Sequence, residues 1–242
     1  MTEYKINENL LRRIVYSINK AVTYDIPRYL REHHKETNNA VIHLRGDYIN
    51  DNLRNYAITD DIKLIPFKRS SWQGRILVDE KNKITYSITT QNNLKCIPRK
   101  KDRQKPHFLQ SILSIENSNC EAQYVQQSLF PMETFDNEIL ENDYNDIFSN
   151  LINPSEGYIH YVISYDSKNS ELLDVKLEVL DRSFNVVYEK SLNEFIKPDY
   201  ANLTEPNVVA SENPSSSTEN MRSILGIKKG IRPSLKEIEE EA

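Results

Sequence analysis

The sequence predicts an α+β fold in which helices come first and a largely antiparallel sheet follows. Over residues 1–58 apolar residues recur at helical steps of three and four. From residue 59 onward they alternate with polar residues over short runs, as in half-buried strands. Because helical and strand patterns are segregated along the chain rather than alternating, an antiparallel sheet is favoured over a parallel one.

The first 58 residues are predicted to form a helical cap that joins the body, residues 59–197, in one globular unit. Pro27 lies where the first turn of a second helix tolerates proline, and residues 46–58 predict a third helix. The first helix carries one apolar stripe, formed by Ile6, Leu10, Leu11, Ile14, Val15, Ile18 and Val22.

The first strands of the body are predicted at residues 62–67, 74–79 and 83–90. Pro66 cannot donate a backbone hydrogen bond to a central ladder, which indicates an edge strand. The other two strands predict a hairpin whose turn has Asn82 in the left-handed conformation. Alternation in the last strand places its polar side chains on the solvent face; these are Thr85, Ser87 and Thr89.

The rest of the body predicts two helices and then a strand meander. A short helix or loop follows Pro106, and helical spacing returns over residues 137–152. The meander is expected from three alternating runs, at residues 157–166, 171–181 and 185–192. After Pro198 large apolar residues become scarce and prolines and serines frequent, so residues 198–242 predict a disordered tail with short amphipathic pieces.

Composition excludes several classes of protein. The chain has 242 residues, a net charge of −5, five glycines and no glycine-rich phosphate loop. The charged N-terminus has no signal core, and no run is long and apolar enough to span a membrane. Cys96 and Cys120 match no metal-ligand spacing. We expect a cytoplasmic protein with free thiols, no membrane contact, and no bound metal or other cofactor.

The first candidate site is a basic stretch, residues 99–105. Its side chains could neutralise phosphates, with His107 and Phe108 placed to contact bases and Lys68, Arg69 and Trp72 extending the same surface. The alternative is a solvated connection between a strand and a helix. The cations concerned are Arg99, Lys100, Lys101, Arg103 and Lys105.

The strand meander offers a catalytic hypothesis. Asp166 ends one strand, and Asp174 and Lys176 share one face of the next. This order resembles the D-x(n)-[D/E]-x-K pattern of restriction-endonuclease-like nucleases, which implies Mg²⁺ held by the carboxylates and a water steadied by the lysine. The tripeptide D-x-K also occurs elsewhere in the chain, and a polar sheet face is ordinarily wet.

Two further segments suit protein partners. Residues 126–130, with Gln126, Leu129 and Phe130, resemble the pentapeptide that binds the bacterial sliding clamp; the alternative is a plug on the protein's own core. The tail suits folding on a partner, because amphipathic pieces follow a polar linker. Its docking residues would include Ile224, Leu225, Leu235 and Ile238.

The Asn-, Ile- and Lys-rich chain, with its segments FKRSSWQGRILVD and PHFLQSIL, resembles an uncharacterised family of accessory proteins in low-GC bacteria. The resemblance implies an interaction or regulatory protein, associated with a toxin–antitoxin or phage-defence system, that docks a protein partner through its tail. The alternatives are a Mg²⁺-dependent nuclease and a DNA-associated factor recruited to the sliding clamp. The sequence specifies neither the partner nor the oligomeric state.

Overall fold

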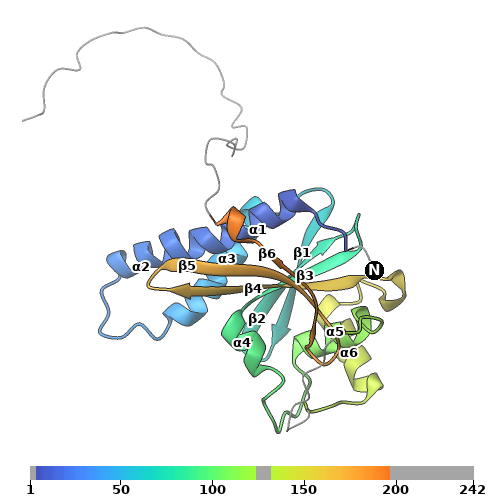
Figure 1. Cartoon of the computed structure of the whole chain (residues 1–242). Helices are drawn as coiled ribbons and strands as arrows, with labels where there is room; N and C mark the ends of the chain where they lie inside the picture. The colour runs from blue at the N-terminus through green and yellow to red at the C-terminus, as the bar shows by residue number, and fades with distance from the viewer. Residues whose placement is uncertain (1–3, 124–131, 197–242) are drawn as a thin grey trace, which may run out of the picture. The chain divides into compact units, whose positions relative to one another are not determined.

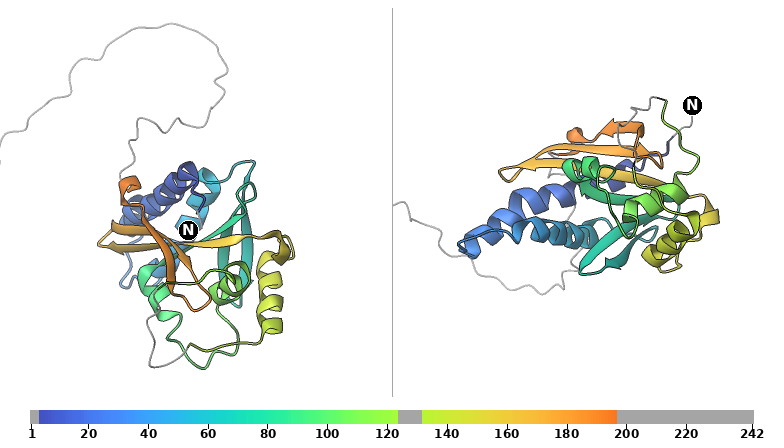
Figure 2. Two further views of the ribbon diagram at one scale, coloured as in Figure 1. Left: turned by 45° about the vertical axis from the view of Figure 1, so that its right-hand side comes forward. Right: turned by 90° about the horizontal axis from the view of Figure 1, so that it is seen from below.

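Six strands form one mixed sheet that lies between two groups of helices (Figure 1, Figure 2). The structure is a computed structural model that describes residues 4–123 and 132–196. The strands are β1 Ile62–Arg69, β2 Trp72–Asp79, β3 Ile84–Thr90, β4 Ile159–Lys168, β5 Glu171–Leu180 and β6 Val186–Ser191. They follow chain order across the sheet, and every neighbouring pair is antiparallel except β3 and β4. The predicted α+β fold is confirmed.

Helices precede the sheet and also connect its two halves. They are α1 Glu8–Lys20, α2 Ile26–Glu32, α3 Val41–Tyr56, α4 Gln91–Cys96, α5 Phe108–Glu116 and α6 Asn137–Phe148. The first helix begins where the Asn7 side chain accepts a hydrogen bond from the Leu10 N–H, and a π-helical turn joins it to α2. Among the described residues no helix is long and apolar enough to cross a bilayer.

The first hydrophobic core lies between the sheet and the pair α1 and α3. Alternate strand residues point into it, such as Tyr161 of β4 and Val175 and Leu177 of β5. The predicted apolar stripe of α1 meets them, and burying each such side chain contributes about 1.5–3 kcal/mol. Its fully buried members are Leu11, Ile14, Val15 and Ile18.

The second hydrophobic core covers the opposite face of the sheet with α5 and α6. Val78 and Val162 reach it from the strands, and Tyr144 and Phe148 reach it from α6. The ring centroids of that aromatic pair are 4.6 Å apart. The sheet is therefore covered by helices on both faces.

Buried polar side chains lie on this second face of β3 and β4. Thr85 and Ser87 are at most 2% exposed, and His160 of β4 is fully buried beside them. The prediction that these β3 residues face solvent is wrong, because α5 and α6 cover the face on which they stand. Their polar groups are satisfied by one another instead of by water.

The turn between β2 and β3 also differs from the prediction. Lys83, with φ of 56°, takes the left-handed conformation instead of Asn82. Asn82 donates its backbone and side-chain N–H groups to the Asp79 carboxylate, at 3.0 and 2.8 Å. These bonds hold Asn82 outside the left-handed region and leave that conformation to the next residue.

The sheet opens between β2 and β3. These strands pair only from Leu77 to Asp79, opposite Tyr86 to Ile84, whereas β1 and β2 stay paired to the hairpin tip at Arg69 and Trp72. The β1–β2 hairpin therefore diverges from the rest of the sheet (Figure 2). As predicted, β1 with its Pro66 is an edge strand.

Candidate functional site: a cationic pocket beside an exposed tryptophan

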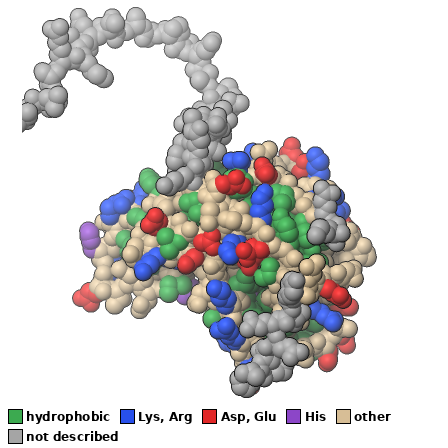
Figure 3. Space-filling view, in the orientation of Figure 1, with side chains coloured by type: hydrophobic (Ala, Val, Ile, Leu, Met, Phe, Trp, Pro, Cys, Tyr) green, Lys and Arg blue, Asp and Glu red, His purple; other side chains and the backbone are tan. Residues whose placement is uncertain are grey.

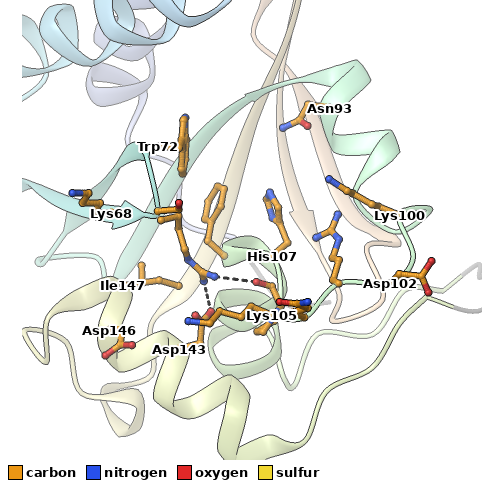
Figure 4. Close-up of a pocket in the computed structure, with 16 residues that line it drawn as sticks. Lys68, Trp72, Asn93, Lys100, Asp102, Lys105, His107, Asp143, Asp146 and Ile147 are labelled. Atoms are coloured by element: carbon orange, nitrogen blue, oxygen red, sulfur yellow. Dashed lines mark hydrogen bonds and ion pairs between the residues drawn. The ribbon is translucent and has the colours of Figure 1, made fainter.

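A pocket of about 860 Å³ lies where the hairpin tip, the basic stretch and α6 meet (Figure 4). We call it the cationic pocket. Five of its lining residues carry positive charge and three carry negative charge, which leaves an excess of two positive charges. These residues are Lys68, Arg69, Lys100, Arg103 and Lys105, with Asp102, Asp143 and Asp146. An anionic ligand is therefore favoured.

Two of the cations are fixed by the protein itself. Arg69 forms an ion pair with Asp143 and donates to the Pro106 carbonyl at 3.0 Å. Arg103 donates to the Ile97 carbonyl at 3.0 Å, while its buried Nε has no hydrogen-bond partner among the described residues. Burial lowers the pKa of Arg103, and the charge of Glu133 partly opposes that shift. These contacts hold the side chains of the two arginines in the pocket wall.

The other three cations are available to a ligand. Within residues 4–123 and 132–196, Lys68, Lys100 and Lys105 have neither a hydrogen-bond partner nor an ion-pair partner for their side chains. Figure 4 shows Lys68 and Lys100 on opposite sides of the ring of Trp72. Three lysines that have no partner among the described residues and line one concave surface suit a ligand that carries several phosphates.

An aromatic platform forms the upper wall of the pocket. Trp72 is 46% exposed, and its ring stacks on Phe108 with centroids 5.6 Å apart and planes inclined by 29°. Phe67 meets Trp72 edge-on at 5.4 Å. Gly74 makes this packing possible, because a Cβ at that position would lie 2.5 Å from the Phe67 ring. The exposed part of the indole can stack on a planar ligand.

His107 lines the pocket as a neutral side chain. Its Nδ1 accepts a hydrogen bond from the Leu109 N–H at the start of α5, so a neutral ring carries its proton on Nε2. Burial, with the charges of Arg103, Arg69 and Lys100, lowers the pKa of His107 to about 3. His107 can thus donate one hydrogen bond without adding charge.

The structure brings together most of the predicted basic surface. Lys100, Arg103, Lys105, His107 and Phe108 line the same pocket as Lys68, Arg69 and Trp72, whereas Arg99 and Lys101 are not among its lining residues. The contribution of α6 was not anticipated. Asp143, Asp146 and Ile147 share one helix face at steps of three and four. That spacing identifies the face, but it does not show that this face meets the hairpin tip.

The residues of the nuclease hypothesis have other partners in the folded protein. Asp166 and Asp174 are cross-strand neighbours on β4 and β5. The Asp174 carboxylate accepts hydrogen bonds from the side-chain amides of Gln91 and Asn193, at 2.7 and 2.8 Å. Lys176 forms an ion pair with Glu189 at 3.0 Å. Figure 3 shows acidic and basic side chains interspersed on the face of the molecule that it presents.

In the part of the chain that the structure describes, no group of three or more His, Cys, Asp or Glu residues could hold a metal ion. The nuclease hypothesis stays a prediction that cleavage assays with Mg²⁺ can test. The residues that resemble the clamp-binding pentapeptide, Gln126, Leu129 and Phe130, lie outside the described residues. So do the tail, residues 198–242, and its docking residues Ile224, Leu225, Leu235 and Ile238.

A buried polar network that the sequence did not predict lies under the second core. Tyr144 donates to Glu116 Oε1 at 2.8 Å, and Thr85 Oγ1 contacts Glu116 Oε2 and, at 2.6 Å, His160 Nδ1. Ser87 Oγ lies 2.8 Å from His160 Nε2. Burial raises the pKa of Glu116 to about 7 and lowers that of His160 to about 3. Both side chains are at most 2% exposed, so we assign the network a structural role.

Together these observations define an α+β protein with a mixed six-stranded sheet between two helical layers and a cationic, aromatic pocket beside the hairpin tip. The model of a family of unknown function, DUF5986, matches residues 3–242, and the chain belongs to this family. The predicted resemblance to an uncharacterised family is thereby confirmed. No curated protein and no solved structure matches the chain.

Proposed function

We propose that the protein binds single-stranded nucleic acid in the cationic pocket. The observation that supports this most directly is that Lys68, Lys100 and Lys105, none of them paired with another described residue, line the same pocket as the exposed Trp72. Lysines neutralise successive phosphates, and an exposed aromatic ring stacks on a base whatever its sequence. The phosphate and the base of a nucleotide therefore each meet a complementary surface in the same pocket.

A single strand fits this pocket better than a duplex does. In a duplex the base faces are stacked on one another and cannot reach the Trp72 ring, whereas the bases of a single strand are free to stack on it. The pocket is concave and is bounded on three sides by the hairpin tip, the basic stretch and α6. Such a shape admits an extended backbone more readily than a rigid duplex.

The wider roles expected from the sequence are proposals that would use this binding. A component of a phage-defence or toxin–antitoxin system, or a factor recruited to the sliding clamp, would bring the pocket to its nucleic acid. Docking of a protein partner through residues 198–242 would act alongside it.

The test is fluorescence anisotropy of labelled single-stranded DNA and RNA with the full chain over a range of salt concentrations. The wild-type affinity should fall steeply with salt. Replacing Lys68, Lys100 and Lys105 with Gln should weaken binding and reduce the slope of log affinity against log salt by about 0.7 for each lost phosphate contact. Trp72→Ala should weaken binding while leaving that slope unchanged.

A matched control separates local contacts from net charge. Lys5, Lys81 and Lys168 are exposed and line no described pocket, so their replacement by Gln makes the same charge change elsewhere. The control variant should bind like the wild type. Equal losses in both triple variants, or a wild-type protein that binds no single strand at low salt, would contradict the proposal.

A further inference from the structure

The opening between β2 and β3 forms a second cavity, of about 670 Å³, which we call the crevice. Gln73 and Arg75 line it from β2, Ser87 and Thr89 line it from β3, and Tyr165 lines it from β4. Beyond the pairs that end at Leu77 and Tyr86, β2 and β3 no longer pair with each other. The crevice therefore enters the sheet between two strands instead of resting on its surface.

The crevice lies at one end of the parallel seam of the sheet. It lies toward the carboxyl ends of β3 and β4, which are the one parallel pair among the six strands. A cavity of this volume is in the range that holds a small molecule or one nucleotide.

The side of α3 that faces the crevice contains a glycine that the fold does not need. Gly46 is in the middle of the helix, where glycine costs about 1 kcal/mol relative to alanine. A Cβ at this position would meet no heavy atom within 4 Å, and the residue has no positive φ. Neither close packing nor backbone conformation explains the residue. Its effect is to keep the crevice open on the helix side.

The crevice adjoins the cationic pocket, because Trp72 and Phe108 line both. Its walls combine apolar and aromatic side chains, such as Leu77 and Tyr165, with the amides of Asn50 and Gln73. Aromatic and apolar side chains together with hydrogen-bonding amides suit a nucleobase, which has two π faces and a polar edge.

We propose that the crevice receives an unstacked base of the same strand whose phosphates lie in the cationic pocket. This proposal rests on the proposed function, since the pocket must bind the strand before the crevice can hold its base. Trp72, which lines both cavities, stacks on the neighbouring base. The site therefore recognises a single-stranded oligonucleotide and not an isolated phosphate group.

The first experiment uses the wild-type full chain and a short single-stranded oligonucleotide in which one abasic position is moved along the sequence. One or two abasic positions should weaken binding on the order of five- to a hundredfold, as expected for the loss of one stacked base. The salt slope should stay unchanged, because the phosphates remain in place. A 2-aminopurine at the sensitive position should change its fluorescence on binding.

The second experiment fills the crevice through Gly46. Gly46→Phe places a ring in the open space, and Gly46→Ala is the matched control that adds only a methyl group. Both variants should melt at or above the wild-type temperature, because both remove a helical glycine. The alanine variant, which adds only a methyl group to the crevice, should discriminate less than the wild type but more than the phenylalanine variant. The phenylalanine variant should bind intact and abasic strands equally, with no 2-aminopurine signal.

The outcomes separate the two proposals. Salt-dependent binding with no sensitive abasic position, or a Gly46→Phe variant that still discriminates, overturns the base site and leaves the cationic pocket standing. Absence of binding by the wild type overturns both. The abasic scan uses the wild-type protein, so it decides the question even if the phenylalanine variant proves unstable.

Discussion

Replacing Glu116 with Gln should make the protein more stable at pH 8 and leave it little changed at pH 4.5. The pKa of Glu116 rises from 4.5 to about 7 because the carboxyl group is buried, and hydrogen bonds from Thr85 and Tyr144 oppose only part of that shift. One pKa unit corresponds to about 1.4 kcal/mol, so ionising this group inside the folded protein costs about 3 kcal/mol.

The direction of the change in stability with pH follows from which state holds the proton. Between pH 4.5 and 7 the folded protein keeps a proton on Glu116 that the unfolded chain releases. The stability contributed by this group is complete below pH 4.5 and is lost as the pH rises through 7. Gln cannot ionise, and its side-chain amide can take the place of the protonated carboxyl group beside Thr85 and Tyr144.

The measurement is urea unfolding of both proteins from pH 4.5 to 8.5. The difference in unfolding free energy should move by about 3 kcal/mol in favour of Glu116→Gln across this range. The tautomer of His160 gives an independent readout. When Glu116 is protonated it donates to Thr85, Thr85 donates to Nδ1, and His160 keeps its proton on Nε2.

Ionisation of Glu116 reverses the direction of these hydrogen bonds. Thr85 then donates to the carboxylate, His160 donates from Nδ1, and Ser87 donates to Nε2. Nitrogen NMR shifts of His160 should therefore change near pH 7 in the wild type and stay constant in the variant. A flat free-energy difference together with an invariant His160 spectrum would refute the reasoning.

Three further predictions concern stability. The pKa of His160 is lowered from 6.5 to about 3, so stability should be lost as the pH falls below 6.5. This loss should be steeper in Glu116→Gln, because the variant lacks the opposing effect of the Glu116 carboxyl group. The midpoints of urea unfolding measure the loss in both proteins. Asn117→Ala removes two hydrogen bonds to the carbonyls of His160 and Leu180 and one from the His160 N–H, so we expect a loss of roughly 3 kcal/mol by chemical unfolding. A chain that ends at Tyr200 should keep a cooperative thermal transition within a few degrees of the full chain, because the residues beyond it are poor in large apolar side chains; loss of the transition would contradict this.

Much of the fold could be predicted from local pattern. The stripe of α1 and the alternation of β4 and β5 report which residues share a face, and Pro66 indicates an edge strand. These signals are local, since each depends on residues a few positions apart. The order of strands in a sheet is not local. The parallel pairing of β3 with β4 depends on residues far apart in the chain and left no mark on either strand.

Burial of the polar face of β3 could not be predicted from the sequence pattern for a related reason. Alternation in β3 separates Thr85 and Ser87 from Ile84 and Tyr86, but it does not show what covers each side. Covering the polar side needs partners for every hydroxyl group, and these come from His160 and Glu116, far away in sequence. The cationic pocket was predictable in its basic half for the opposite reason, since those cations are neighbours in the chain.

The parallel seam between β3 and β4 has a consequence for how the chain folds. The sheet consists of two antiparallel halves, β1 to β3 and β4 to β6, and each is built from strands adjacent in sequence. Each half can form after closing only short loops. The seam cannot form until the long connection from Thr90 to Ile159, with α4, α5 and α6, has been closed. The rate of folding is therefore expected to depend on assembly of the seam, so that mutations along it slow folding while mutations in the hairpins mainly speed unfolding.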